Sequence, residues 1–182
     1  MLENWVVVPT SLPKVLRRCH ACASETYRAN GKFRINANHK LLDAWLLVLC
    51  TACGETAKLT VFERMNVRSV RPEMLDRMHD NDPRLAAELL QDPVVRRRNR
   101  VALDWDDAWR LDTGGSDHPD REVIDVSVRF AAQIPVRPVR LIAEGCGLSR
   151  SGVEKLIADG KLVSTARLSG KLSSDFTFTL RR

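Results

Sequence analysis

The stretch AWLLVLCTACGETAKLTVFER, residues 44–64, decides the fold of the N-terminal part of the chain. AWLLVLC is an apolar run of strand length, and AKLTVFER (57–64) alternates apolar and polar residues as a half-buried strand does. Between them lies CTACG (50–54), whose glycine tolerates the positive φ of a tight turn. The stretch therefore predicts two strands joined by a turn that carries two thiols.

Upstream segments extend this sheet. KFRIN (32–36) is expected to form a strand that reaches AWLLVLC through a turn at ANHK (37–40). NWVVVP (4–9) is expected to add a further strand. We therefore expect an antiparallel, zinc-ribbon-like sheet in residues 1–71.

A second pair of thiols, in CHAC, precedes these strands. Two thiolates three positions apart bind one ion from a tight turn, and a second such turn completes a tetrahedron. Four sulfur ligands with no open position favour structural Zn²⁺. The expected ligands are Cys19, Cys22, Cys50 and Cys53. A redox dithiol and an iron–sulfur cluster stay open as alternatives, but neither pair has thioredoxin-like surroundings.

The middle of the chain, residues 72–120, changes to short helices. Asp82-Pro83 and Asp92-Pro93 each match a helix cap followed by proline at the first helical position. VALDWDDAWRLD (101–112) is expected to form a hairpin that turns at its central aspartates.

The C-terminal segment, residues 121–182, contains a pair of helices. Their expected ranges are 140–145 and 149–159, with Ser149 as the cap of the second helix. Two helices joined at a glycine turn form the helix-turn-helix arrangement. The residues that follow are expected to be β structure, with a turn at 168–171 and a strand over 175–180.

Two known modules are similar to this segment. The run Ala143, Gly147, Leu148, Ser149, Val153 and Leu156 resembles a DNA-reading helix-turn-helix. The runs Arg140-Leu141, Leu148-Ser149-Arg150, Lys155-Leu156-Ile157 and Gly160-Lys161-Leu162 resemble the S-four RNA-binding domain. The β structure after the helices favours the second module, which sets two helices against a small sheet and meets structured RNA through its basic helix face. The expected phosphate contacts are Arg140, Arg150, Lys155, Lys161 and Lys171.

A resemblance over most of the chain connects both ends. WVVVPTSLPKVLRRCHAC, GKFRINANHKLLDAWLLVLCTACGET and GLSRSGVEKLI together look like the bacterial domain-of-unknown-function family 1062. This resemblance implies a metal site at the cysteines and an S-four-like C-terminal module. It implies no substrate.

Charge divides the chain into the same three segments. The net charge of +6 consists of +6 in residues 1–71, −5 in residues 72–120 and +5 in residues 121–182. Two basic ends fit an anionic partner. No apolar run approaches the roughly 20 residues that cross a bilayer, and the first residues lack the pattern of a secretory signal. We therefore expect a cytoplasmic protein without membrane contact.

These patterns predict an α+β protein: a zinc-ribbon-like sheet, short helices in the middle, and a C-terminal module of two helices plus a small sheet. The expected function is that of a zinc-binding protein that contacts structured RNA. The alternatives are a protein-interaction scaffold without nucleic-acid binding and a helix-turn-helix regulator that binds duplex DNA. No nucleophile–base set, phosphate loop or open metal site indicates an enzyme.

Overall fold

The computed structural model describes residues 2–115 and 122–181, which belong to two compact units. The inserted unit is Leu12–Asp104, and the terminal unit combines Met1–Ser11 with Trp105–Arg182. Both units contain helices and a largely antiparallel sheet, which confirms the predicted α+β class. The units divide the chain differently from the three predicted segments, because the first strand of the chain pairs with two strands that follow residue 104. The boundary predicted between residues 120 and 121 lies outside the described residues.

The inserted unit is built on a five-stranded antiparallel sheet with the strand order β5-β4-β3-β2-β6. Its strands are β2 (Lys14–Leu16), β3 (Thr26–Asn38), β4 (Leu41–Cys50), β5 (Thr56–Asn66) and β6 (Ala102–Asp104). On β4, buried residues alternate with half-buried ones, so one face of the strand enters the core. Leu46 and Val48 on that face belong to the same core as Leu85 and Leu89 from the helices. The expected strands around the second cysteine pair are thus confirmed.

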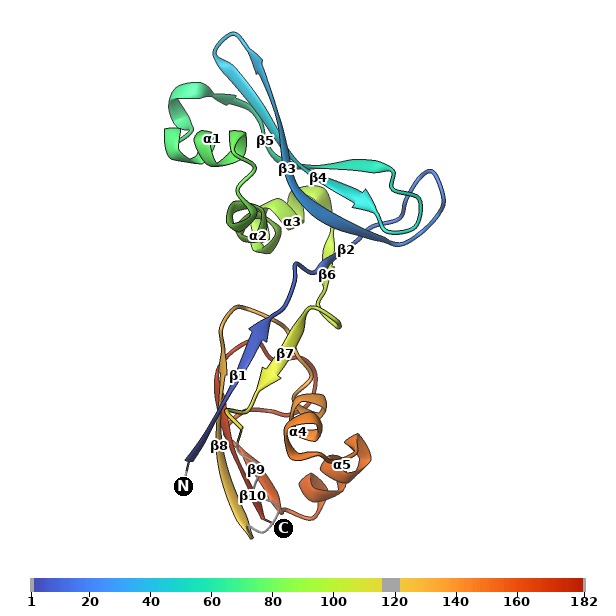
Figure 1. Ribbon diagram of the computed structural model, residues 1–182, viewed down its shortest axis with the longest axis vertical. Coiled ribbons are helices and arrows are strands. Elements are labelled where there is room, and N and C mark those ends of the chain that lie inside the picture. The colour runs from blue at the N-terminus through green and yellow to red at the C-terminus, as the bar shows by residue number, and fades with distance from the viewer. Residues whose placement is uncertain (1, 116–121, 182) are drawn as a thin grey trace. The chain divides into compact units, whose positions relative to one another are not determined.

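Three short helices cover this core face (Figure 1). They are α1 (Pro72–His79), α2 (Pro83–Gln91) and α3 (Pro93–Asn99), and a 3-10 turn, η1 (Val67–Ser69), precedes them. The Asp82 carboxylate accepts the Arg84 N–H at 2.8 Å, and the Asp92 carboxylate accepts the Val94 N–H at 2.7 Å. Both predicted caps are therefore confirmed, each with proline at the first helical position.

Side chains close the free edge of β5. The Asn99 amide accepts the Thr60 N–H at 2.7 Å and donates to the Thr60 carbonyl at 2.9 Å. Arg17 donates to the carbonyl of Lys58 at 3.4 Å, and Arg98 donates to the carbonyl of Val61. These bonds occupy backbone groups that an exposed edge strand would offer to another chain.

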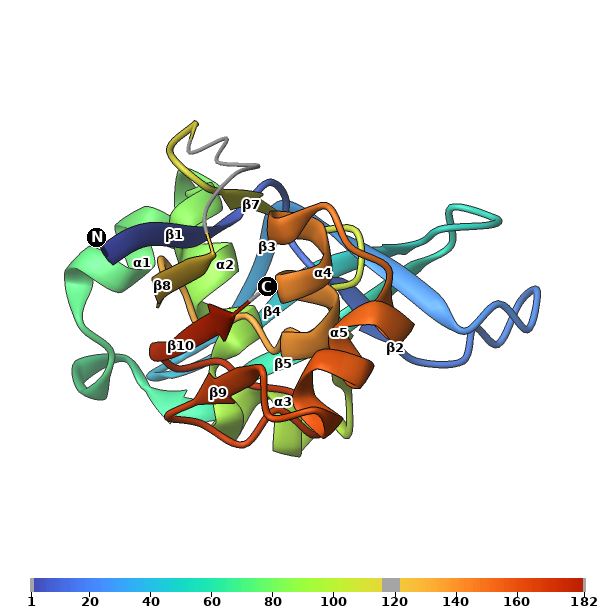
Figure 2. The same ribbon diagram turned by 90° about the horizontal axis from the view of Figure 1, so that it is seen from below.

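The terminal unit carries a second five-stranded sheet with the order β7-β1-β8-β10-β9. Its strands are β1 (Leu2–Pro9), β7 (Trp109–Asp112), β8 (Val123–Phe130), β9 (Leu162–Ser164) and β10 (Phe176–Arg181). β1 and β8 are parallel, and the other neighbours are antiparallel. Figure 2 shows α4 (Pro138–Cys146) and α5 (Arg150–Ala158) on one face of this sheet.

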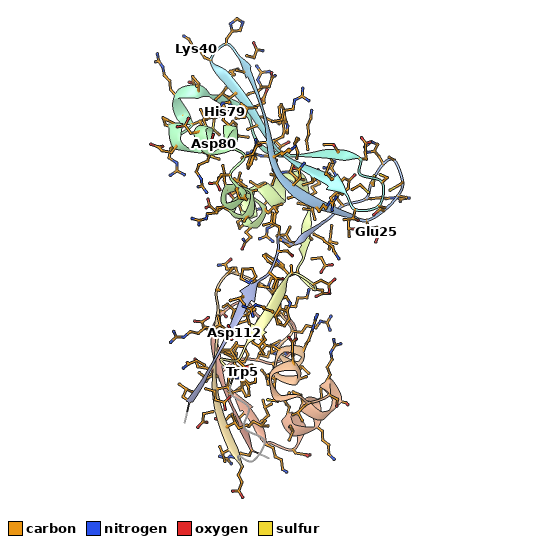
Figure 3. The ribbon with its side chains drawn as sticks, in the orientation of Figure 1. Trp5, Glu25, Lys40, His79, Asp80 and Asp112 are labelled. Atoms are coloured by element: carbon orange, nitrogen blue, oxygen red, sulfur yellow. The ribbon has the colours of Figure 1, made fainter. Side chains whose placement is uncertain are left out.

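The predicted helix pair is confirmed in type and place. The Ser149 hydroxyl accepts the Gly152 N–H at 3.0 Å and caps α5 as expected. Trp5 of β1, labelled in Figure 3, is buried and meets Phe178 edge to face, with ring centroids 5.4 Å apart. A Cβ atom on Gly145 of α4 would lie 2.3 Å from Trp5 Cζ3, so the indole packs directly on the helix backbone.

Two expectations about strand partners are wrong. β1 was expected in the sheet of the cysteine pairs but lies between β7 and β8. The expected hairpin over residues 101–112 does not form, because β6 pairs with β2 and β7 pairs with β1. In both cases the pairing joins residues distant in sequence, which a local pattern cannot specify. None of the helices in the two described ranges has the length and apolar character needed to cross a bilayer.

Candidate metal centre and basic pocket

Two turns of the same design carry the paired cysteines. In the first, the carbonyl of Cys19 accepts the Ala23 N–H at 3.1 Å. In the second, the carbonyl of Cys50 accepts the Gly54 N–H at 3.0 Å. Ala23 and Gly54 occupy the same place in the two turns, and both have positive φ, 60° and 74°. Each turn therefore presents its two sulfurs in the same way.

The sheet brings the two turns together. The first turn connects β2 to β3, the second connects β4 to β5, and Tyr27 on β3 pairs with Cys50 on β4. Thr51 N–H donates to the Thr26 carbonyl at 3.0 Å, and the two threonine hydroxyls lie 2.6 Å apart. Figure 3 shows Glu25, beside the first turn, and Lys40, at the β3–β4 hairpin, at opposite ends of this sheet.

The four sulfurs form a compact cluster. Cys19 Sγ lies 3.8 Å from Cys53 Sγ, Cys22 Sγ lies 3.6 Å from Cys50 Sγ, and all four lie within 4.8 Å of one another. A tetrahedron of sulfurs at the Zn–S length has edges of about 3.8 Å. A disulfide needs about 2.05 Å, and none of these cysteines forms one. The residues thus fit a four-sulfur metal site, and they are the four predicted from the sequence.

The turns favour the thiolate form of the two buried cysteines. Hydrogen bonds from the backbone N–H groups of Cys53 and Ala52 lower the pKa of Cys50 to about 6. The pKa of Cys19 is lowered first by the Tyr27 hydroxyl and then by the backbone N–H of Cys22. Because a metal binds the thiolate, the same N–H groups that shape the turns also prepare these ligands.

Cys53 differs from its neighbours. The Glu55 N–H lowers its pKa, but the Cys22 sulfur, burial and the remaining sulfurs raise it to about 12. Four thiolates at these separations repel one another, so full ionisation of the cluster requires a cation among them.

Tyr27 is a residue of the site that the sequence analysis missed. Its side chain is buried, and its hydrogen bond to Cys19, together with burial, raises the pKa of the phenol to about 12. The hydroxyl therefore stays protonated and donates to the ligand sulfur. Tyr27 is the only tyrosine in the chain, and it lies shortly after the first cysteine turn, which is the signal that could have identified it.

A basic pocket of about 310 Å³ lies in the terminal unit, between the first turns of α4 and α5 and β7. Three arginines line it: Arg137 at the start of α4, Arg140 one turn later, and Arg150 at the start of α5. The Arg140 guanidinium lies 5.3 Å from the centroid of the Trp109 ring and donates to the backbone carbonyl of Asp106 at 3.2 Å. Asp106 also lines the pocket, and its Oδ1 lies 4.0 Å from Arg140 Nη1. The pocket thus combines three cations and one carboxylate with an aromatic wall.

The structure gathers only part of the predicted phosphate contacts at this pocket. Arg140 and Arg150 line it, whereas Lys155 and Lys161 are exposed on α5 and just after it. Lys171 is exposed beside Leu172, which forms a backbone bridge with Val136 of the pocket. Arg137 and Trp109 were missed, because Arg137 precedes the predicted helix and Trp109 comes from a strand assigned to another segment.

The model of a family described as Protein of unknown function (DUF1062) matches residues 35–168, about three quarters of the chain. The chain belongs to this family. The DUF1062 match includes the second cysteine turn and all three pocket arginines, and it begins after the first cysteine turn. Comparisons with curated proteins and with solved structures find no match to the chain.

Proposed function

We propose that this protein is a cytoplasmic, zinc-binding protein that contacts structured RNA through the basic pocket of its terminal unit. Zinc is the proposed metal because four thiolates form a closed tetrahedral set, which suits a structural ion without an open position. In this role the metal fixes the two turns to each other at one end of the inserted unit. The terminal unit, as an S-four-like module, supplies the RNA contact.

The observation that carries the RNA proposal is the convergence of Arg137, Arg140 and Arg150 on one pocket. Arginine presents a planar fork of donors that matches phosphate oxygens, and three such forks at one place supply a strong anion site. The Arg140 fork is already oriented by Trp109 and by the Asp106 carbonyl. A site that recognises phosphates and shape, with little base contact, suits a structured RNA.

Binding of the zinc-loaded protein to an RNA hairpin and to duplex DNA across a salt series tests this proposal. Arg137→Ala/Arg150→Ala is expected to weaken hairpin binding and to reduce the salt slope by about 1.5, since each phosphate contact contributes about 0.7 to 0.9. Arg129→Ala/Arg167→Ala, which removes two exposed arginines of the same unit, is the matched control. Preference for duplex DNA supports a helix-turn-helix regulator instead. Absence of binding at low salt refutes both the RNA-binding and the DNA-binding hypothesis.

Metal content tests the zinc part separately. The purified protein is expected to hold one equivalent of Zn²⁺, and Cys50→Ser is expected to lose it. Cys146→Ser removes the fifth cysteine, which lies on α4 outside the cluster, and is expected to retain the full equivalent. Loss of zinc in both variants, or in neither, contradicts the assignment.

A protein-interaction scaffold is the second candidate, and a groove in the inserted unit that is lined by both apolar and charged residues favours it. A pocket of about 270 Å³ and another of about 410 Å³ share Arg71, Met74, Leu89 and Asp92, so they form one depression across the helices. Val94 at its side is 57% exposed. Failure of RNA binding together with capture of a defined protein that Val94→Asp abolishes would favour this candidate.

A further inference from the structure

The helices α1, α2 and α3 cover one face of the sheet in the inserted unit. The other face of this sheet lies outside that core. On β4 the residues Trp45, Leu47 and Leu49 are half-buried and alternate with the core residues Leu46 and Val48. Successive side chains of a strand point to opposite faces, so these three lie on the face away from the core. We call this surface the β4 face, defined by Trp45, Leu47, Leu49 and the residues paired with them.

Cations flank the apolar strip on both sides. Arg34 and Thr60 pair with Trp45, Lys58 pairs with Leu47, and Arg28 and Thr56 pair with Leu49. Directly paired residues of antiparallel strands lie on the same face of the sheet. The partners of the strip are therefore three cations and two threonines, with no acid among them.

Among the described residues, none of the cations Arg28, Arg34 and Lys58 takes part in a salt bridge. Asp43, the next outward residue of β4 beyond Trp45, adds one carboxylate at the end of the strip, and this carboxylate accepts the Arg64 N–H at 2.7 Å. The β4 face is therefore a positively charged surface with an apolar centre.

The indole of Trp45 lies among these cations. Lys58 Nζ is 5.1 Å from the centroid of the Trp45 ring, within the range of a cation–π contact. The strands β3 and β5 that carry the cations are two strand spacings apart, about 10 Å. A flat aromatic group thus lies between the two arginines of β3 and the lysine of β5, as in surfaces on which bases stack while phosphates are held at the sides.

Charge and geometry together select the occupant. Its groups beside the cations must be anionic, and its centre must be flat and apolar. A duplex buries the faces of its bases and offers only edges in its grooves, so Trp45 cannot stack on it. A single strand exposes base faces and phosphates at once.

We propose that the β4 face binds single-stranded RNA: Lys58 moves from the Trp45 ring to a phosphate, a base stacks on the freed indole, and Arg28 and Arg34 hold the backbone on the other side. This inference rests on the proposed function for the choice of RNA over DNA. It assigns a second contact, in the other unit from the basic pocket. The RNA partner then has both a structured part and an unpaired part.

Binding of a fluorescein-labelled oligouridine of about a dozen nucleotides to the zinc-loaded full chain tests the proposal, with an oligothymidine and an acidic peptide as further probes. Trp45→Leu keeps an apolar side chain but removes the stacking surface, and it is expected to weaken oligouridine binding by about tenfold. Zinc content and circular dichroism equal to the parent show that the variant is folded.

A charge variant with a matched control gives an independent readout. The variant replaces the three cations of the β4 face with alanine and is expected to reduce the salt slope by about 2, since each contact to a single strand contributes about 0.7. The control removes the same charge from exposed arginines on η1, α2 and α3 and is expected to leave the slope near the parent value. The substitutions are Arg28→Ala, Arg34→Ala and Lys58→Ala against Arg68→Ala, Arg84→Ala and Arg97→Ala.

The outcomes separate this inference from the proposed function. Loss of oligouridine binding in the β4-face variants but not in Arg137→Ala/Arg150→Ala supports the inference, even when the hairpin does not bind. Unchanged oligouridine binding in the β4-face variants overturns it, while the pocket variant still tests hairpin binding. Tighter binding of the acidic peptide than of oligouridine, or a change of oligomeric state in Trp45→Leu, also overturns it.

Discussion

Gly145→Ala tests the packing of the first strand on α4. The new Cβ would lie 2.3 Å from Trp5 Cζ3, 2.4 Å from Trp5 Cη2 and 2.9 Å from Leu111 Cδ2. Carbon atoms in contact are separated by about 3.5 to 4.0 Å, so the indole must move by more than about 1 Å. Trp5 is 2% exposed and packs against Phe178, so it has no free space to enter.

The expected loss of stability follows from two opposing effects. Overpacking a core by a methyl group costs about 1 to 3 kcal/mol, and disturbing an aromatic pair adds about 0.5 to 1.5 kcal/mol. Replacing glycine by alanine inside a helix returns about 1 kcal/mol. We expect Gly145→Ala to lower the free energy of unfolding by about 2 kcal/mol, which corresponds to roughly 4 to 8 °C in Tm for a chain of this size.

Urea unfolding of the zinc-loaded protein, followed by tryptophan fluorescence and circular dichroism, measures this change. Gly152→Ala in α5 is the control, because its Cβ would meet only Ser149 Oγ, at 3.2 Å. It is expected to range from neutral to about 1 kcal/mol more stable. The cost of Gly145→Ala is expected to shrink in a Trp5→Leu background. A Gly145→Ala protein as stable as its parent refutes the packing of β1 on α4.

Three further predictions concern the inserted unit. Ala23→Gly is expected to raise the stability of the zinc-loaded protein by about 1 kcal/mol in urea unfolding, because Ala23 has φ 60° where the second turn has glycine; equal or lower stability contradicts this. Tyr27→Phe removes the hydroxyl that donates to Cys19 and is expected to weaken zinc binding by about tenfold in competition with a chromogenic chelator, and an unchanged affinity argues against that role. The Arg77 guanidinium holds the pKa of Asp82 below its ordinary value, so the carboxylate stabilises the fold above about pH 4 and this contribution is lost as the pH falls through the lowered pKa. Asp82→Asn is expected to reduce the acid dependence of the urea midpoint, and identical pH profiles contradict this.

The cysteine site was predictable because its signals are local. Each pair needs only two thiols three positions apart, Gly54 marks the second turn, and the strands beside the second pair are clear in their alternation. The caps at Asp82, Asp92 and Ser149 are local in the same sense, since each side chain bonds to a backbone N–H within three residues.

The terminal sheet was not predictable, because strand partners depend on distant residues. The alternation around Trp5 suits any half-buried strand and does not indicate that β1 lies parallel to β8, more than a hundred residues later. The position of Trp109 at the basic pocket was unpredictable for the same reason. Its neighbours in sequence suggested a hairpin, whereas its place beside Arg140 follows from the pairing of β7 with β1.

The pairing of β1 with β8 has a consequence for the order of events during synthesis. All strands and helices of the inserted unit lie between Leu12 and Asp104. Every residue of its core has therefore been synthesised once residue 104 emerges from the ribosome. β1 emerges first of all, but its parallel neighbour β8 begins only at Val123. Domains that fold as units during synthesis do so when their last partner strand appears. The inserted unit is therefore able to fold and to bring its four cysteines together before the partner strands of β1 have been synthesised.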